Sequence, residues 1–202
     1  MATLLAFDTS GAHCAAAVLR DGLVLSARRE EMAKGQAERL MPLIAETLED
    51  AGLALDGLDA IAVGTGPGNF TGIRLSVAAA RGLSLSLGIP AIGVSVLEAM
   101  AEGGPRPALA VLDARRGAVY VQGFGTGLLA EPAMVADPAE LPAALPRIGE
   151  GPDARAAALP LAEAIARVAA GRLDRAPQRP APLYIRPADA APPRDPAPVI
   201  LE

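Results

Sequence analysis

Large aromatic side chains are almost absent from this sequence. Its 202 residues include no tryptophan, three phenylalanines and two tyrosines, although 51% of the residues are hydrophobic. Alanine, leucine and valine make up the difference, so the core must be built from small side chains that pack closely. A chain of this length can bury the core of one large domain or of two small ones.

Positive charge is also scarce. Lysine and arginine number 18 against 23 aspartates and glutamates, which gives a formal net charge of −5 at pH 7. Proteins that bind nucleic acid by themselves neutralise phosphates with clustered basic side chains. The composition therefore argues against independent nucleic-acid binding, and a partner would have to hold most of any RNA.

Cysteine and histidine occur once each, as Cys14 and His13. A single cysteine excludes a disulfide within the chain and suits a reducing compartment. Because Cys14 lies in the apolar run AHCAAAVL, we expect a buried hydrophobic residue rather than a reactive thiol. So few imidazole and sulfur ligands supply neither a zinc site nor a Ser-His-acid triad. We therefore predict no catalytic residue, no metal and no cofactor.

Neither a signal peptide nor a membrane span is expected. Asp8 interrupts the first apolar run, and no basic segment precedes it. No stretch reaches the roughly 18 uninterrupted apolar residues that a membrane-spanning helix needs. We expect a soluble, cytoplasmic protein with no membrane contact.

Strand patterns open the chain. Short apolar runs occupy residues 4–8, 15–19 and 23–27, and the last two flank the turn Arg20-Asp21-Gly22. An Asp-Gly pair between two apolar runs predicts a tight hairpin. Three consecutive strands are therefore expected.

An amphipathic helix is expected over residues 36–51. Leu40, Ile44 and Leu48 recur there at four-residue spacing, with acidic residues elsewhere. A strand, a second helix rich in small residues and another strand are expected next, at 58–63, 71–87 and 91–94.

The second half of the chain repeats the pattern of the first. The run at 109–113 ends on an acid as the run at 4–8 does, at a period near 105 residues. This match indicates an internal duplication, with subdomains at 1–104 and 105–202.

Later elements are expected to be few. A strand is predicted at 118–124, and beyond Glu131 the proline and alanine content predicts loops, apart from a helix at 159–170. The final stretch from residue 182 is expected to be extended and partly disordered at its end.

The glycine-rich segment GTGPGNFTGIR at 64–74 follows an expected strand and opens an expected helix. Free backbone N–H groups at such a helix start can form a phosphate cradle. No Walker pattern is present, however, and the glycines do not follow the GxGxxG spacing. The favoured interpretation is structural, with glycines that allow a tight turn and with Asn69 or Thr71 capping the helix.

Two acids end corresponding strands of the two halves. If the halves pack as a pseudo-symmetric pair, Asp8 and Asp113 would face each other across a cleft, where such a pair can hold Mg²⁺ through water. The alternative is that both acids cap loops. The candidate contacts to a nucleotide or phosphate are Asp8, Thr9, Ser10, Gly66, Gly68 and Asp113.

Four segments together resemble the TsaB family, also called YeaZ. They are LLAFDTSGAHCAAAVLRDG at 4–22, AVGTGPGNFTGIRLSVAAARGLSL at 62–85, LDARRGAVYVQGF at 112–124 and PLYIRP at 182–187. The resemblance covers essentially the whole chain and is densest up to residue 124. It implies an α/β fold of the actin, sugar-kinase and Hsp70 (ASKHA) class, with two duplicated mixed-sheet subdomains.

The resemblance also implies a function. Members of this family are non-catalytic subunits of the bacterial machinery that makes N6-threonylcarbamoyladenosine in tRNA, where they bind and stabilise a TsaD-like catalytic subunit. The chain is thus expected to work with that subunit and a TsaE-like ATPase, to meet tRNA only through the complex, and to form a homodimer when alone.

A departure from TsaD-like proteins supports a non-catalytic role. Their metal-binding histidines have HxxxH spacing, and the matching stretch here is GVSVLEAM at 93–100. Val96 and Met100 stand at the histidine positions. An alkyl group and a thioether cannot hold the same metal.

The resemblance places the partner contact on the two helices expected at 36–51 and 71–87. The residues expected to contact the partner are Leu40, Met41, Ile44, Leu48, Ile73, Val77 and Ala80. A few buried Leu or Ile side chains, each contributing about 1.5–3 kcal/mol, would suffice for a stable complex. Alternatively the stripe packs on the chain's own sheet, and the sequence leaves open which residues face outward.

The competing hypothesis is an enzyme, either an ATP-binding phosphotransferase of the same fold or a TsaD-like hydrolase. Asp8, Asp113 and the glycine segment favour it. The missing metal ligands and the lack of a nucleophile with a neighbouring base count against it.

Overall fold

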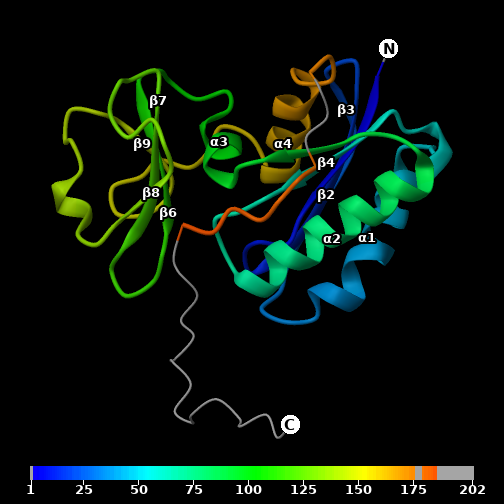
Figure 1. The fold of residues 1–202 in the computed structure, drawn as a ribbon, viewed down its shortest axis with the longest axis horizontal. Coiled ribbons are helices and arrows are strands. Elements are labelled where there is room, and N and C mark those ends of the chain that lie inside the picture. The colour runs from blue at the N-terminus through cyan, green and yellow to red at the C-terminus, as the bar shows by residue number, and fades with distance from the viewer. Residues whose placement is uncertain (1, 176–178, 186–202) are drawn as a thin grey trace, which may run out of the picture.

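Two mixed β-sheets organise the protein (Figure 1). The computed structural model describes residues 2–175 and 179–185. The first sheet has the strand order β3-β2-β1-β4-β5 and the second the order β8-β7-β6-β9. The strands of the first sheet are β1 (Thr3–Asp8), β2 (His13–Arg20), β3 (Leu23–Glu31), β4 (Ala60–Gly64) and β5 (Ala91–Val94). Those of the second are β6 (Ala108–Asp113), β7 (Val119–Phe124), β8 (Ala133–Val135) and β9 (Arg147–Glu150).

The second sheet repeats the connectivity of the first. Strands β1, β2 and β3 form an antiparallel meander, and β4 then pairs with β1 in parallel. Strands β6, β7 and β8 form the same meander, and β9 pairs with β6 in parallel. The internal duplication and the ASKHA-type fold expected from the sequence are therefore confirmed.

Helices cover both faces of the first sheet. Figure 1 shows α1 (Gln36–Asp50) and α2 (Phe70–Leu87) side by side on one face and α4 (Leu161–Ala170) on the other. Short helix α3 (Val96–Ala101) lies between the two sheets. Two further short segments are 3₁₀ helices, at Leu55–Gly57 and Pro138–Glu140.

Helix α4 crosses the division into 1–104 and 105–202. The two sheets fall on either side of residue 104, but α4 packs on the first sheet rather than on the second. Its Ala164 and Ile165 share a buried cluster with Leu4 and Ala62 of β1 and β4. Residues 105–202 therefore do not pack together as one unit, because α4 packs on the first sheet. The subdomain boundary at residue 104 stays a prediction.

The apolar stripe of α1 faces inward. Leu40, Ile44 and Leu48 are buried in one cluster with Phe7 and Val63 of the first sheet. Apart from Met41 and Pro42, the exposed positions of the helix carry charged or small residues, which is the division expected of an amphipathic helix on a sheet. The stripe thus provides the domain core.

The hairpin between β2 and β3 has the geometry that its sequence predicts. Asp21 and Gly22 have φ angles of 50° and 81°. Positive φ at both central residues is the mark of the type I′ turn, whose twist matches that of the flanking strands.

Strands β8 and β9 and helix α3 were not predicted from the sequence. Strands β8 and β9 have three and four residues, too few for an alternating pattern to stand out from proline-rich loops. They exist because β7 and β6 offer unpaired backbone edges to them. Helix α3, capped by the Ser95 hydroxyl, is equally short. The expectation of loops beyond Glu131 was therefore wrong for these two strands.

Cys14 is buried in the first sheet, as expected. Burial raises the pKa of its thiol to about 11, and the nearby Glu30 adds to this effect. The thiol therefore stays protonated at neutral pH.

The C-terminal stretch and the absence of a membrane span were also predicted from the sequence. Of the final stretch from residue 182, residues 182–185 are described and have no regular secondary structure; the rest lies outside the described residues. No helix in the described part of the chain is long and apolar enough to cross a membrane.

We predict that Ile44→Ala lowers the free energy of unfolding by about 2–5 kcal/mol, because it leaves a cavity in the core. The matched control is Met41→Ala on the same helix, where the side chain is 45% exposed. Its cost should stay within about 0.5 kcal/mol. Urea unfolding followed by circular dichroism measures both, and equal costs would contradict the inward orientation of the stripe.

Candidate functional site

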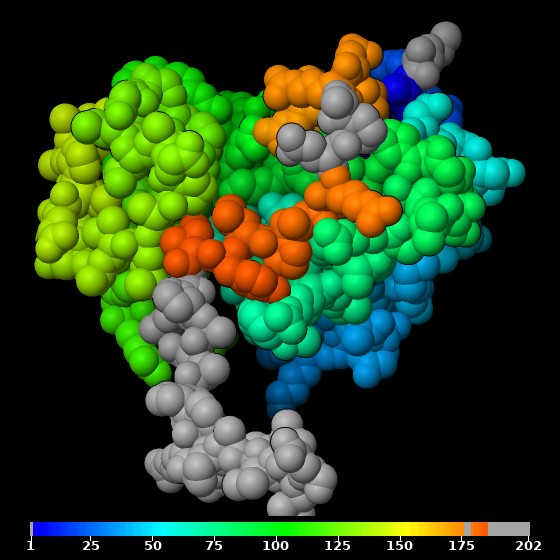
Figure 2. Space-filling model, viewed as in Figure 1, coloured from blue at the N-terminus to red at the C-terminus, as the bar shows by residue number. Residues whose placement is uncertain are grey.

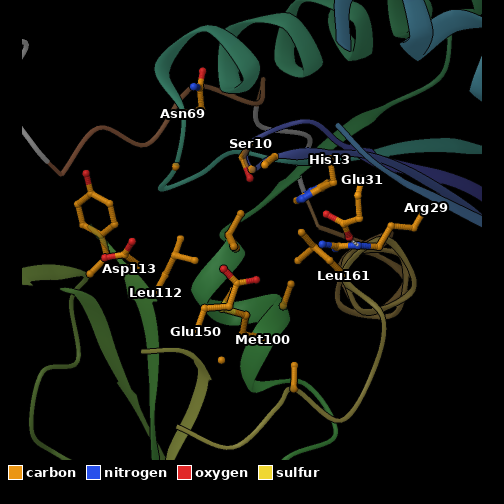
Figure 3. Close-up of a pocket in the computed structure, with 18 of the residues that line it drawn as sticks. Ser10, His13, Arg29, Glu31, Asn69, Met100, Leu112, Asp113, Glu150 and Leu161 are labelled. Atoms are coloured by element: carbon orange, nitrogen blue, oxygen red, sulfur yellow. Dashed lines mark hydrogen bonds and ion pairs between the residues drawn. The ribbon is translucent and has the colours of Figure 1, made fainter. Parts of the chain in front are cut away.

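A cleft of about 1060 Å³ separates the two sheets. Figure 3 shows Ser10 and His13 on the wall formed by the first sheet, with Leu112, Asp113 and Glu150 on the opposite wall. Met100 of α3 lies between them. The cleft thus lies where the sequence expected it, between the ends of the corresponding strands β1 and β6.

Asp8 is buried beneath the wall of the cleft. Its Oδ1 accepts hydrogen bonds from the Ser10 N–H at 2.9 Å and the Ser10 hydroxyl at 2.8 Å, and lies 2.8 Å from His13 Nε2. Its Oδ2 packs against Gly64, where a Cβ would lie only 1.9 Å away. This carboxylate therefore fastens the β1–β2 turn, and its fully buried oxygens do not line the cleft.

Asp113 is exposed and does line the cleft. Its Oδ1 accepts a hydrogen bond from the Arg115 N–H at 2.9 Å, which makes it the cap of its own loop. Of the expected pair, only Asp113 is presented to a ligand. The structural alternative, in which both acids hold their turns, fits the observed contacts.

In the glycine segment, the start of α2 packs directly on the β1–β2 turn. The Thr9 hydroxyl donates to the Gly72 carbonyl at 2.7 Å, and a Cβ on Gly72 would lie 1.8 Å from the Thr9 carbonyl oxygen. At Gly68, a Cβ would lie 2.4 Å from the Ser10 carbonyl oxygen. Glycine is required at both positions because two backbones touch.

Three N–H groups at the start of α2, those of Asn69, Thr71 and Gly72, are already used. The Asn69 N–H donates to the Ser10 carbonyl at 2.6 Å. The Asn69 side chain accepts from the Thr71 and Gly72 N–H groups at 3.0 and 3.1 Å, so Asn69 is the helix cap. Gly66 is buried, with φ +93°. The protein's own atoms thus occupy the positions that a phosphate would take, which favours the structural interpretation of this segment.

Val96 and Met100 lie one turn apart on α3. Both are buried in an apolar cluster with Ala110 and Tyr120. Side chains that bind no hard cation thus occupy the positions at which the resemblance places histidines. Among the described residues, no group of three or more His, Cys, Asp or Glu is arranged to hold a metal ion.

The expected partner-facing residues need correction. Of the seven, Met41 alone is exposed, and the other six belong to the chain's own core: Leu40, Ile44, Leu48, Ile73, Val77 and Ala80. These six side chains pack on the first sheet, because the apolar face of the sheet would otherwise contact water.

The outward faces of the same two helices carry different residues. On α1 the exposed positions include Ala37, Met41 and Ala45, at four-residue spacing. On α2 an exposed stripe recurs at three- or four-residue spacing; its members are Phe70, Arg74, Ala78, Gly82 and Leu85. The signal in the sequence was this second periodic stripe, which mixes small, charged and apolar residues and which hydrophobicity alone does not pick out.

An ion-pair network ties α1 to β3. Arg39 forms pairs with Glu30 and Glu46 at 2.6 Å, and Arg28 pairs with Asp50 at 2.6 Å and with Glu46 at 3.0 Å. Hydrogen bonds from Arg39 hold the pKa values of Glu30 and Glu46 below their usual range. The network fixes how α1 lies across the edge of the sheet.

Known proteins resemble this chain over most of its length. The TsaD family model, described as tRNA N6-adenosine threonylcarbamoyltransferase, matches residues 27–134. The TsaB protein of Escherichia coli, named as a tRNA threonylcarbamoyladenosine biosynthesis protein, is 39% identical over 122 residues, which is 58% of this chain and 52% of the relative. An uncharacterised protein of Mycobacterium leprae is 36% identical over 204 residues, 95% of this chain and 57% of that protein. The chain therefore spans little more than half the length of these curated relatives.

A solved structure matches the fold. It is a Pseudomonas aeruginosa protein described as similar to the peptidase YEAZ, with a TM-score of 0.77 and 31% identity. The match covers 92% of this chain and 100% of that one.

We predict that Gly72→Ala lowers the free energy of unfolding by about 3 kcal/mol, because its methyl group would collide with the Thr9 carbonyl. The matched control is Gly82→Ala in the same helix, where no atom lies within 4 Å of an added Cβ. The control should raise stability by about 0.5–1 kcal/mol through helix propensity. Thermal unfolding of both variants measures the difference. A Gly72→Ala variant as stable as the wild type would rule out the close contact between Gly72 and Thr9.

Proposed function

The chain belongs to the TsaB (YeaZ) family, and we propose that it is a non-catalytic subunit in the synthesis of N6-threonylcarbamoyladenosine in tRNA. In this proposal it binds and stabilises a TsaD-like catalytic subunit, works with a TsaE-like ATPase, and meets tRNA only through the complex. The names of its relatives support the pathway, and the outward face of α1 and α2 supports a binding role.

The observation that carries the proposal is this outward face. Leu85 is 84% and Met41 45% exposed, and the same faces carry small residues such as Ala45 and Ala78. Small side chains let the helices of a partner approach closely, and large exposed apolar side chains gain free energy when covered. A partner of the same fold would offer matching helices, so the contact is a bundle of four helices. Without that partner, two copies of this chain would use the same face in a symmetric dimer.

The non-catalytic assignment rests on three residues. Val96 and Met100 supply no metal ligand, and Asp8 is buried with its Oδ1 hydrogen-bonded within the chain's own turn. An ATP-binding phosphotransferase would need both that carboxylate and the first N–H groups of α2 to face the cleft. A TsaD-like hydrolase would need the missing metal ligands. Both alternatives are therefore less well supported.

Reconstitution by omission tests the proposal. A TsaD-like subunit and its other partners from the same organism receive ATP, threonine, bicarbonate and tRNA, with or without this chain, and modified adenosine is quantified. We expect product only when the chain is present and none from the chain alone. Equal product without it would refute the proposal, and Mg²⁺-dependent ATP binding would then be measured next.

We predict that Met41→Asp weakens binding to the TsaD-like subunit at least tenfold, because a carboxylate would be desolvated in an apolar contact. The matched control is Leu128→Asp, a substitution at a 53% exposed leucine that follows β7 in the second sheet. Its affinity should match that of the wild type. Isothermal titration calorimetry gives both constants, and equal losses would place the contact elsewhere.

A further inference from the structure

Three side chains form a stacked cluster at the start of α2. The Arg74 guanidinium lies 3.8 Å from the centre of the Phe70 ring, and Arg74 Nε donates to the Tyr184 hydroxyl at 2.8 Å. The Phe70 and Tyr184 rings are 5.2 Å apart and inclined at 31°. Both rings are nearly half exposed, so the cluster lies on the surface of the protein.

Tyr184 comes from the strap, the segment of residues 179–185. Figure 2 shows the strap running over the start of α2, between the two halves of the molecule. The Leu183 N–H donates to the Thr65 carbonyl at 2.7 Å, and Ile185 packs in the apolar cluster of α3 and the second sheet. Pro180 is buried against Gly93. Contacts on both sides therefore fix Tyr184 in place beside Arg74.

Arg74 has no acidic partner among the described residues. Arg28, Arg39 and Arg167 each pair with a carboxylate, whereas in the described part of the chain the Arg20 side chain hydrogen-bonds only to the Thr3 hydroxyl. The chain has more acids than bases, so spare carboxylates are available to it. Within the described residues the two terminal nitrogens of Arg74, Nη1 and Nη2, donate no hydrogen bond either. The Arg74 guanidinium is thus held rigidly on the surface, and its Nη1 and Nη2 have no hydrogen-bond partner among the described residues.

Arg74 also belongs to the outward stripe of α2. It lies four residues before Ala78 and eleven before Leu85, spacings that place all three on one face of a helix. The strap therefore extends the proposed docking face past the first turn of α2. Arginine stacked on aromatic rings is typical of the residues that dominate the affinity of protein interfaces.

We propose that Arg74 binds an aspartate or glutamate side chain of the protein that docks on α1 and α2. This inference rests on the proposed function. The planar guanidinium offers Nη1 and Nη2 as a fork that matches the two oxygens of a carboxylate. Phe70 and Tyr184 are positioning residues: they fix the rotamer before binding, so less side-chain entropy is lost on association. The partner's carboxylate supplies the negative charge that pairs with the Arg74 guanidinium.

The test measures affinity of the full chain for the TsaD-like subunit of the same organism by isothermal titration calorimetry at two salt concentrations. Arg74→Gln should weaken binding about 30-fold, the size expected when one partner of a desolvated charge pair is removed. The matched control is Arg155→Gln, which removes an equal charge from an exposed arginine after β9. Its affinity should change less than about threefold.

Two conservative variants separate geometry from charge. Arg74→Lys keeps the charge but loses the planar fork, so it should restore binding only in part. Tyr184→Phe keeps the ring and removes the hydroxyl that holds Nε, so it should weaken binding less than Arg74→Gln does. Circular dichroism and thermal unfolding check that each variant folds like the wild type.

The possible outcomes distinguish the inference from the proposed function. If the wild-type chain does not bind the subunit, the proposed function fails. If Met41→Asp loses binding while Arg74→Gln keeps it, docking stands and this inference is overturned. If Arg74→Gln keeps its affinity for the subunit but the assembled complex retains less tRNA, the ligand of Arg74 is a phosphate, and the inference is overturned as well. Rescue of Arg74→Glu by an acid-to-lysine substitution in the subunit would identify the paired carboxylate.

Discussion

The contact between the Thr9 carbonyl and Gly72 determines where α2 lies. Because a Cβ at this point would come within 1.8 Å of the oxygen, the first turn of the helix can rest directly on the β1–β2 turn. The Asn69 cap and the Thr9 hydroxyl lock that position from both sides. Once the start of the helix is fixed, Ile73 must face the sheet and Arg74 must face solvent. Both the core and the surface face of α2 follow from this single backbone approach.

The same contact limits what the segment can bind. In a nucleotide-binding protein the N–H groups at the start of such a helix point at phosphate oxygens. Here the Ser10 carbonyl and the Asn69 side chain accept those hydrogen bonds. A backbone group cannot hold a helix in place and remain free for a ligand. The glycines that look like a phosphate loop are thus explained by close packing alone.

Local patterns predicted most of the fold. The hairpin at Asp21 and Gly22 and the capped helix α2 follow from patterns within a few residues, and the repeat of the two sheets follows from two similar short runs about 105 residues apart. The allocation of the α1 and α2 side chains could not be predicted, because a helix stripe looks the same whether its own sheet or a partner covers it. The burial of Asp8 depends on Ser10 and His13 folding back over it. Tyr184 lies 110 residues from Arg74, and no local pattern joins two residues so far apart.

The division of labour on α1 and α2 explains how one pair of helices can serve both folding and binding. Their large apolar side chains, such as Ile44 and Val77, are buried by the chain's own sheet and need no partner to cover them. Their outward faces combine small residues, such as Ala45 and Ala78, which permit close approach, with a few large exposed side chains. The small residues themselves gain little free energy from the area that a partner covers. Affinity must therefore come from the few larger side chains, and the strap holds one of them, Arg74, in position through Tyr184.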